Sequence, residues 1–412
     1  MKSVFLFFIF FIDIFCKVEK IEFIPIKYNK DSGFFTIPIS FGSNKEIFEL
    51  QIDTTTSKSW IPSPKFPLDV KKYNISKSST GIITKRSLEL EDEDGTVFGK
   101  ACYETIKIGL NEFKQFGFGL MNEIDYKFND YPQGKLGLGY SQQNDVDFNI
   151  IKHFKKMGLI EKEEFMIDSR SNILLIGNIS KHLKMRHGEC HLLETNTLAR
   201  IYRESWSCLL TFLFYDISYI KLNNHVVTSV NYEYIVETNG WALFDSAFNY
   251  ISFPRKYFNN FINNFFKGYI DSCKIFKDLD WIYFKCYDKS FVDIAEIYFL
   301  INNEIYPLYS DRLFIETGNG EYELLIRFYK KEDNVFIFGN PFMKNLSISY
   351  DYEEKKISFY GVNSFTYEEA LNHFQKKLDQ ENWETFKDLL ILLLFVLIFV
   401  IIIVFIKECC KK

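Results

Sequence analysis

One short pattern occurs once in each half of the chain, and it constrains the fold more than any other feature. Asp53 and Asp245 each end a run of apolar residues, and a hydroxyl residue follows each of them, Thr54 in the first copy and Ser246 in the second. Nearly half the chain length separates the two copies. Two carboxylates that come from matching halves can face each other, share one proton and activate a water molecule.

The rest of the central region has the pattern of short strands. The clearest apolar segments are bounded by glycine, asparagine or aspartate and lie at residues 33–42, 47–52, 105–109 and 172–177. A helical period is found mainly at residues 148–157 and 257–266, each well after one of the aspartates. The pattern therefore predicts a mostly β fold with a few short helices.

The two ends of the chain predict a secreted protein that is anchored in a membrane. Residues 1–16 combine an early lysine with a short apolar core, as in a signal peptide, with Asp13 as the one exception to the pattern. Residues 389–406 lack charge and proline and are long enough for a transmembrane helix, the alternative being a buried core helix. Lysines follow this segment and acidic residues precede it, so residues 407–412 are expected in the cytoplasm.

This topology is that of a single-pass type I membrane protein of the secretory or endosomal pathway or the cell surface. Between the two ends we expect an N-terminal β lobe at 17–200, a C-terminal β lobe at 201–362 and a charged helical stalk at 363–388. The net charge of −5 gives no reason to expect nucleic acid as a partner. We expect a monomer.

Five cysteines fall in the part expected outside the cytoplasm. Cys273 and Cys286 flank a short aromatic segment and are the best disulfide candidates. A pairing of Cys190 with Cys208 is weaker and would leave Cys102 as a buried thiol.

Two further sets of residues bear on location and metal binding. Three Asn-X-Ser sequences are glycosylation candidates: Asn74, Asn178 and Asn345. One His/Cys cluster could be taken for a metal site but fits an ordinary surface connection better: His182, His187, Cys190 and His191. We expect no metal and no cofactor.

Taken in order, these segments resemble those of the pepsin-like aspartic proteases. In that family each lobe carries an Asp-Thr/Ser-Gly loop and a later apolar pair before a glycine that passes beneath the loop. The segments that carry the resemblance cover residues 33–362: Asp53-Thr54 with Trp60-Ile61-Pro62, residues 134–139, residues 174–177, Asp245-Ser246, residues 339–345, residues 350–352 and residues 357–359. The chain is identified as a divergent member.

The resemblance implies a bilobal fold with Asp53 and Asp245 at the floor of a cleft. One carboxylate would act as general base, and the other, protonated, would polarise the carbonyl of a peptide or protein substrate. Thr54 and Ser246 match the hydroxyl positions that brace the two loops. Acid pH would favour activity, because the pair must hold one proton.

The sequence departs from the family pattern next to both aspartates. Thr55 and Ala247 stand where the family has glycine, which permits close approach of the backbone. We expect the larger Thr55 to crowd the catalytic water or to move Asp53. Phe248 replaces a small hydroxyl residue near the second aspartate and would remove a hydrogen-bond partner of its carboxylate.

Two other departures concern the cleft entrance and the start of the chain. Residues 88–99 align with the hairpin that covers the cleft in the family, and Asp92 falls at the position of its tyrosine, within an acidic run. We interpret the run as a solvated hairpin tip rather than a calcium loop. The short stretch after Lys17 leaves no room for a long inhibitory pro-segment.

These observations leave two hypotheses. The first is a membrane-anchored aspartic-type endopeptidase with an Asp53–Asp245 dyad, which retention of both acids favours. The second is an inactive pseudoprotease that binds peptides or a protein partner in the same cleft, which Thr55, Phe248, Asp92 and the missing pro-segment favour.

Overall fold

The computed structural model describes most of the region between the two predicted apolar ends. The described residues are 21–29, 33–91, 95–126, 133–140, 146–179, 186–191, 206–214, 235–266, 269–278, 280–301, 304–329, 334–344, 346–360 and 365–366. The predicted signal peptide at 1–16, the membrane span at 389–406 and the tail at 407–412 lie outside them. Within the described ranges, no helix has the length and apolar character that crossing a membrane requires.

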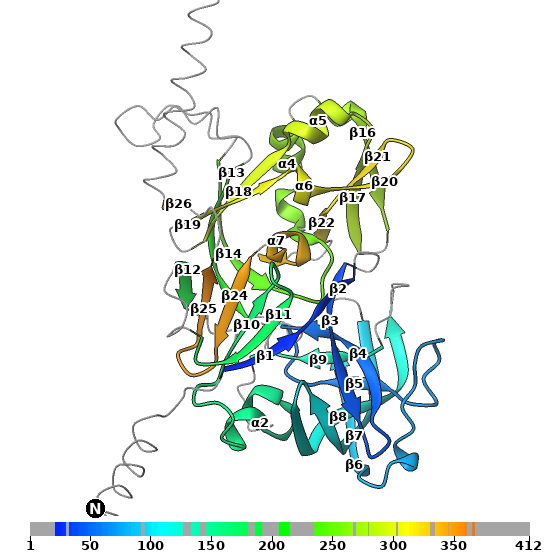
Figure 1. Ribbon diagram of the computed structural model, residues 1–412. Helices are drawn as coiled ribbons and strands as arrows, with labels where there is room; N and C mark the ends of the chain where they lie inside the picture. Colours follow the sequence, from blue (N-terminus) through cyan, green and yellow to red (C-terminus); the bar gives the residue numbers. More distant parts are fainter. Residues whose placement is uncertain are drawn as a thin grey trace, which may run out of the picture.

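The strands form three sheets, which makes the fold mostly β as predicted (Figure 1). The N-terminal lobe is an eight-stranded sheet in the order β2-β3-β4-β9-β5-β8-β7-β6. Its strands are β2 (Lys27–Asn29), β3 (Phe34–Phe41), β4 (Glu46–Asp53), β5 (Trp60–Pro62), β6 (Ile82–Glu91), β7 (Gly95–Ile108), β8 (Asn111–Tyr126) and β9 (Lys135–Gly137). Strand β3 alternates half-buried and buried residues, as a sheet with one face on the core requires.

The C-terminal lobe is built on a larger sheet in the order β20-β21-β17-β22-β15-β23-β14-β13-β18-β19-β26, with β16 paired to β17. Its strands are β13 (Ser207–Phe214), β14 (Ile235–Phe244), β15 (Ile251–Pro254), β16 (Cys273–Lys277), β17 (Trp281–Cys286), β18 (Glu296–Ile301), β19 (Glu304–Tyr309), β20 (Phe314–Gly318), β21 (Glu321–Leu324), β22 (Ile326–Tyr329), β23 (Val335–Phe338) and β26 (Phe365–Thr366). The last of these falls in the predicted helical stalk, but it is a strand that pairs with β19.

The third sheet draws strands from both halves of the sequence, in the order β1-β11-β10-β24-β25-β12. Its strands are β1 (Ile21–Pro25), β10 (Glu164–Asp168), β11 (Ile173–Gly177), β12 (Arg186–His191), β24 (Ser347–Asp351) and β25 (Lys356–Tyr360). Strand β10 pairs with β24, so the end of the second half lies beside the first half. The sheets therefore divide the chain differently from a single boundary near residue 200.

The described residues include five short α-helices, two of which lie where the sequence has a helical period. They are α2 (Ile150–Lys156), α4 (Phe258–Phe265), α5 (Lys289–Ile294), α6 (Ser310–Leu313) and α7 (Asn340–Met343). The Asn149 side chain caps α2 by accepting from the amides of Ile151 and Lys152. The helices predicted within 148–157 and 257–266 are thus confirmed.

Aromatic side chains from the second half of the sequence bind the segment after β9 of the N-terminal lobe. Trp206 is fully buried, packs edge-on against Tyr140 and donates its indole N–H to the Leu138 carbonyl at 2.9 Å. The hydroxyl of Tyr352 donates to the same carbonyl at 2.8 Å. These contacts fix the segment that follows β9, which lies directly beneath the first aspartate loop.

Candidate active site

The first aspartate lies where two parallel strands end together. Asp53 is the last residue of β4, and its Cα partner on β9 is Gly137. The Leu138 amide donates to the Asp53 carbonyl at 2.7 Å, which holds the loop against β9. A Cβ at Gly137 would lie 2.6 Å from the Lys58 amide nitrogen, so the close passage requires glycine.

The second aspartate has the same arrangement in the other lobe. Asp245 follows β14, which runs parallel to β23, and its amide donates to the Phe338 carbonyl at 3.0 Å. The next residue after β23 is Gly339, where a Cβ would collide with the carbonyl oxygens of Phe248 and Tyr250. The repeated apolar pair before glycine therefore serves the same purpose in both halves: it lets a strand pass under an aspartate loop.

Hydroxyl groups of the two loops cross from lobe to lobe. Thr54 Oγ1 donates to the Phe244 carbonyl at 2.6 Å and accepts from the Ser246 amide at 3.1 Å. Ser246 Oγ donates to the Ile52 carbonyl at 2.7 Å. Thr54 and Ser246 are both fully buried. These reciprocal bonds place the two aspartate loops side by side, with each hydroxyl bonded just before the aspartate of the other lobe.

Residues of its own loop bind one oxygen of the Asp53 carboxylate. Oδ1 accepts from the Thr55 amide at 2.8 Å, from Thr55 Oγ1 at 2.6 Å and from the Thr56 amide at 3.2 Å. The crowding expected of Thr55 thus takes a different form, because its hydroxyl is turned onto the aspartate. A glycine could supply the amide contact but not the hydroxyl contact.

A lysine that the sequence reasoning did not single out faces the other oxygen. Lys135 Nζ lies 3.1 Å from Asp53 Oδ2, and the two side chains are 4% and 0% exposed. Lys135 precedes the glycine-ended apolar pair of β9. The signal was present in the sequence as a charged residue within a buried strand, but only the parallel pairing of β9 with β4 brings it to Asp53.

Asp245 has a different environment from Asp53. It is 3% exposed, and its Oδ1 accepts from the Ala247 amide at 2.7 Å. Burial and the nearby Asp245 charge both raise the pKa of Tyr350, so this phenol stays neutral beside the site. Phe248 turns to the C-terminal lobe, where its ring packs against those of Tyr250 and Trp281 at 5.9 and 5.6 Å between centroids.

Two buried amides that the sequence reasoning missed also bind the second loop. Gln51 Nε2 donates to the Ala247 carbonyl at 3.0 Å, from β4 of the other lobe. Asn340 Nδ2 donates to the carbonyls of Ser246, at 3.2 Å, and Gly33, at 2.6 Å. Both are polar residues among apolar neighbours, which is the pattern that could have identified them.

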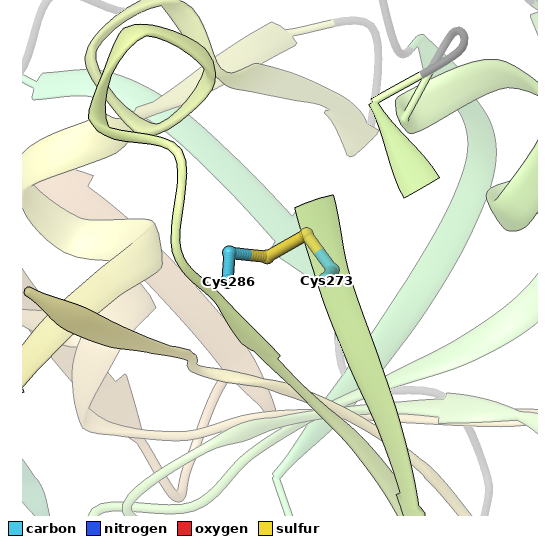
Figure 2. The surroundings of a disulfide bond; sticks show 2 residues. All are labelled: Cys273 and Cys286. Carbon is cyan, nitrogen blue, oxygen red and sulfur yellow. A yellow bond between two sulfur atoms is a disulfide. The ribbon is translucent and has the colours of Figure 1, made fainter. Parts of the chain in front are cut away.

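The remaining candidate residues lie away from the two loops. Cys273 and Cys286 form a disulfide between the paired ends of β16 and β17 (Figure 2), and Cys102 is a buried free thiol. Asn74 and Asn178 are half-buried. Asn345, Asp92 and His182 lie outside the described residues, as do the side chains of β12, which contains His187, Cys190 and His191.

Comparison with known proteins places this geometry in a family. The model of the eukaryotic aspartyl protease family matches residues 34–362, which is most of the chain. An acid protease of Saccharomycopsis fibuligera is 22% identical over 350 residues, covering 81% of this chain and 82% of that protein.

Shorter alignments are found with two mammalian proteins. Pregnancy-associated glycoprotein 1 of Sus scrofa is 26% identical over 159 residues, or 35% of this chain, and pepsin A-5 of Mus musculus is 27% identical over 165 residues, or 37% of this chain. The chain spans only 40% and 42% of the lengths of these two relatives. The family match includes both aspartate loops and the strands beneath them. The chain therefore belongs to the eukaryotic aspartyl protease family.

Proposed function

We propose that the protein is an aspartic-type endopeptidase in which Asp53 and Asp245 together activate water. Membership of the family supports peptide hydrolysis in general. The observation that carries the proposal for these two residues is the reciprocal bonding of their loops, in which Thr54 and Ser246 each reach across to the other lobe. Such bracing holds two carboxylates in a fixed relation, which a shared proton and a bound water require.

The proposed chemistry uses the two carboxylates in different roles. One removes a proton from water, the other donates a hydrogen bond to the peptide carbonyl, and the water attacks directly without an acyl-enzyme. The Ala247 amide orients Asp245, and the Thr55 and Thr56 amides orient Asp53. These steps need no cofactor, and the substrate is a peptide or protein.

We further propose that the two lobes lie in the lumen of the secretory or endosomal pathway or outside the cell. The apolar character of residues 1–16 and 389–406 supports a signal peptide and a membrane anchor. A relative in Candida albicans, 27% identical over 175 residues, is described as a secreted aspartic protease, which agrees with this location.

A second candidate function is peptide binding without hydrolysis. The observation in its favour is that the Asp53 side chain is 0% exposed, with one oxygen bonded to Thr55 and Thr56 and the other facing Lys135. A carboxylate so enclosed has to be uncovered before it can hold water. Binding in the cleft would need no such rearrangement.

The test is cleavage of a mixed peptide library by the full-length protein in detergent, from pH 3 to pH 7. We expect Asp53→Asn and Asp245→Asn each to lower kcat/KM by about 10²-fold or more, as loss of an acid or base does. The exposed Asp311→Asn is the matched control and should keep wild-type activity. Folded wild-type protein that cleaves nothing, yet binds library peptides equally well with Asn at position 53, would exclude the enzyme and support the binder.

A further inference from the structure

The buried Lys135 is the least expected charge near the aspartate loops. Lys135 is 3% exposed as a whole residue. Strand β9 places it opposite Gln51 of β4 and Trp60 of β5. An ammonium group buried to this degree is costly unless a counter-charge is near. The Asp53 carboxylate at 3.1 Å supplies that charge. Lys135 and Asp53 are therefore bound to each other rather than to solvent.

The pair leaves Asp53 with no oxygen that faces open space. Oδ1 accepts from Thr55 and Thr56, and Oδ2 faces the ammonium. With an exposed fraction of 0%, the side chain cannot touch a water-sized sphere in this conformation. Lys135 Nζ, at 3.1 Å, lies within contact distance of the Oδ2 oxygen to which a catalytic water would bind.

The charges around the two loops lead to a further consequence. Among the described residues near the two loops, Asp53 on β4 pairs with Lys135 on β9 at 3.1 Å. The charge of Asp245, after β14, helps to raise the pKa of Tyr350 on β24. Two neighbouring carboxylates repel each other unless one positive charge is added, and a shared proton normally provides it. Lys135 already provides a positive charge at this site.

We propose that the Lys135 ammonium takes the place of the shared proton, so that Asp53 and Asp245 are both carboxylates in the resting protein and Lys135 must leave Oδ2 before water binds. The inference rests on the proposed peptidase function for its effect on catalysis, but not for the charge arrangement. Lys135 is then a positioning residue that sets how readily Asp53 acts.

A neighbouring side chain shows that this part of the sheet is built for polar contacts. Gln51 on β4 lies opposite Lys135 on β9. It is 2% exposed, and its side-chain amide donates to the Ala247 carbonyl of the second loop. Of these two paired residues, Lys135 contacts the first aspartate, Asp53, and Gln51 binds the second loop at Ala247. An apolar side chain at position 135 would fill the same space without adding charge.

The test compares Lys135→Met, which keeps length but not charge, with Lys135→Arg, which keeps charge. Lys107→Met, at an exposed position of β7 in the same sheet, is the matched control. With full-length protein and the peptide library, we expect K135M to raise kcat/KM below pH 5 by about 10²-fold, the lower range of what a positioned acid contributes. K107M should keep the wild-type profile, and K135R, which keeps the charge, should raise kcat/KM below pH 5 less than K135M does. If folded K135M is no more active than wild type at any pH while wild type cleaves, the proposal is overturned.

A second measurement does not depend on activity. Infrared spectra at pH 6 should show the carbonyl band of a protonated carboxyl group in K135M, absent from wild-type protein and lost again in K135M combined with Asp245→Asn. If these infrared bands are observed but neither wild-type protein nor any variant cleaves peptide, the proposed peptidase function is rejected and the proposed charge arrangement is retained. The same band in wild-type protein, or its absence from K135M, would refute the replacement of the proton by Lys135.

Discussion

At the scale of single residues, Thr55 shows how a departure from the family pattern is accommodated. Its amide and its hydroxyl both donate to Asp53 Oδ1, at 2.8 and 2.6 Å, and the residue is 4% exposed. Hydrogen bonds to a charged acceptor contribute more than neutral ones, because the charge strengthens them. The β-branched side chain therefore adds a contact to the aspartate.

We expect Thr55→Gly to lower the free energy of unfolding by about 1–3 kcal/mol, from loss of the hydroxyl bond and from greater backbone freedom of the unfolded chain. Urea denaturation at pH 7 measures it. Thr55→Ser retains the hydroxyl and should lose about 1 kcal/mol or less. Equal losses in the two variants would mean that the hydroxyl bond contributes nothing.

At the scale of elements, helix α2 illustrates a titratable group inside the N-terminal lobe. His153 is 5% exposed, lies edge-on to Phe113 and Phe116, and its Nε2 is 2.9 Å from the Asp147 carbonyl. Burial lowers the pKa of His153 below its ordinary value near 6.5. At a pH between the two pKa values, the ring is therefore neutral in the folded protein and protonated in the unfolded chain.

The sign of the pH effect follows from this difference. As pH falls from 6.5 toward the lower pKa of the folded protein, the unfolded chain binds the proton first. His153 therefore lowers the free energy of unfolding over this range, by up to about 1.4 kcal/mol per pH unit. We expect His153→Gln to lose less stability than wild type between pH 7 and pH 5 in urea titrations. Lys152→Gln, on the same helix, should follow wild type. Parallel pH curves for wild type and H153Q would contradict the expectation.

The same elements show what could be predicted from the sequence. The helical periods gave α2 and α4, and the apolar segments gave β3, β4, β7 and β11, because local pattern determines these elements. Lys135 and Gln51 escaped notice as site residues, because their partners depend on which strands pair. Sequence spacing does not encode the parallel pairing of β4 with β9, which brings residues 51–53 beside residues 135–137.

At the scale of the whole molecule, the shared sheet makes the two halves depend on each other. Strand β10 lies between β11 and β24, and Tyr350 of β24 stacks on Phe165 of β10 at 4.7 Å between ring centroids. Trp206 reaches from the second half to the Leu138 carbonyl of the first. This exchange was not evident from the sequence, since a half-molecule repeat suggests two self-contained lobes.

We therefore expect fragments 17–200 and 201–366 not to fold when expressed separately, because β10 would lose β24 and expose its unpaired edge. Near-ultraviolet circular dichroism and gel filtration test this, and mixing the two fragments should restore the signal of the intact protein. A native-like spectrum from fragment 17–200 alone would show that the shared sheet is dispensable.

The hydroxyl bonds between the two aspartate loops also limit how the molecule can move. Thr54 and Ser246 each bond a carbonyl of the opposite lobe, and Gln51 adds a third link, all within two residues of an aspartate. A rotation of one lobe against the other stretches these short bonds least when its axis passes through them. The region between the two aspartate loops is thus the natural pivot of the molecule: distant parts of the lobes can shift while the spacing of the two loops stays constant.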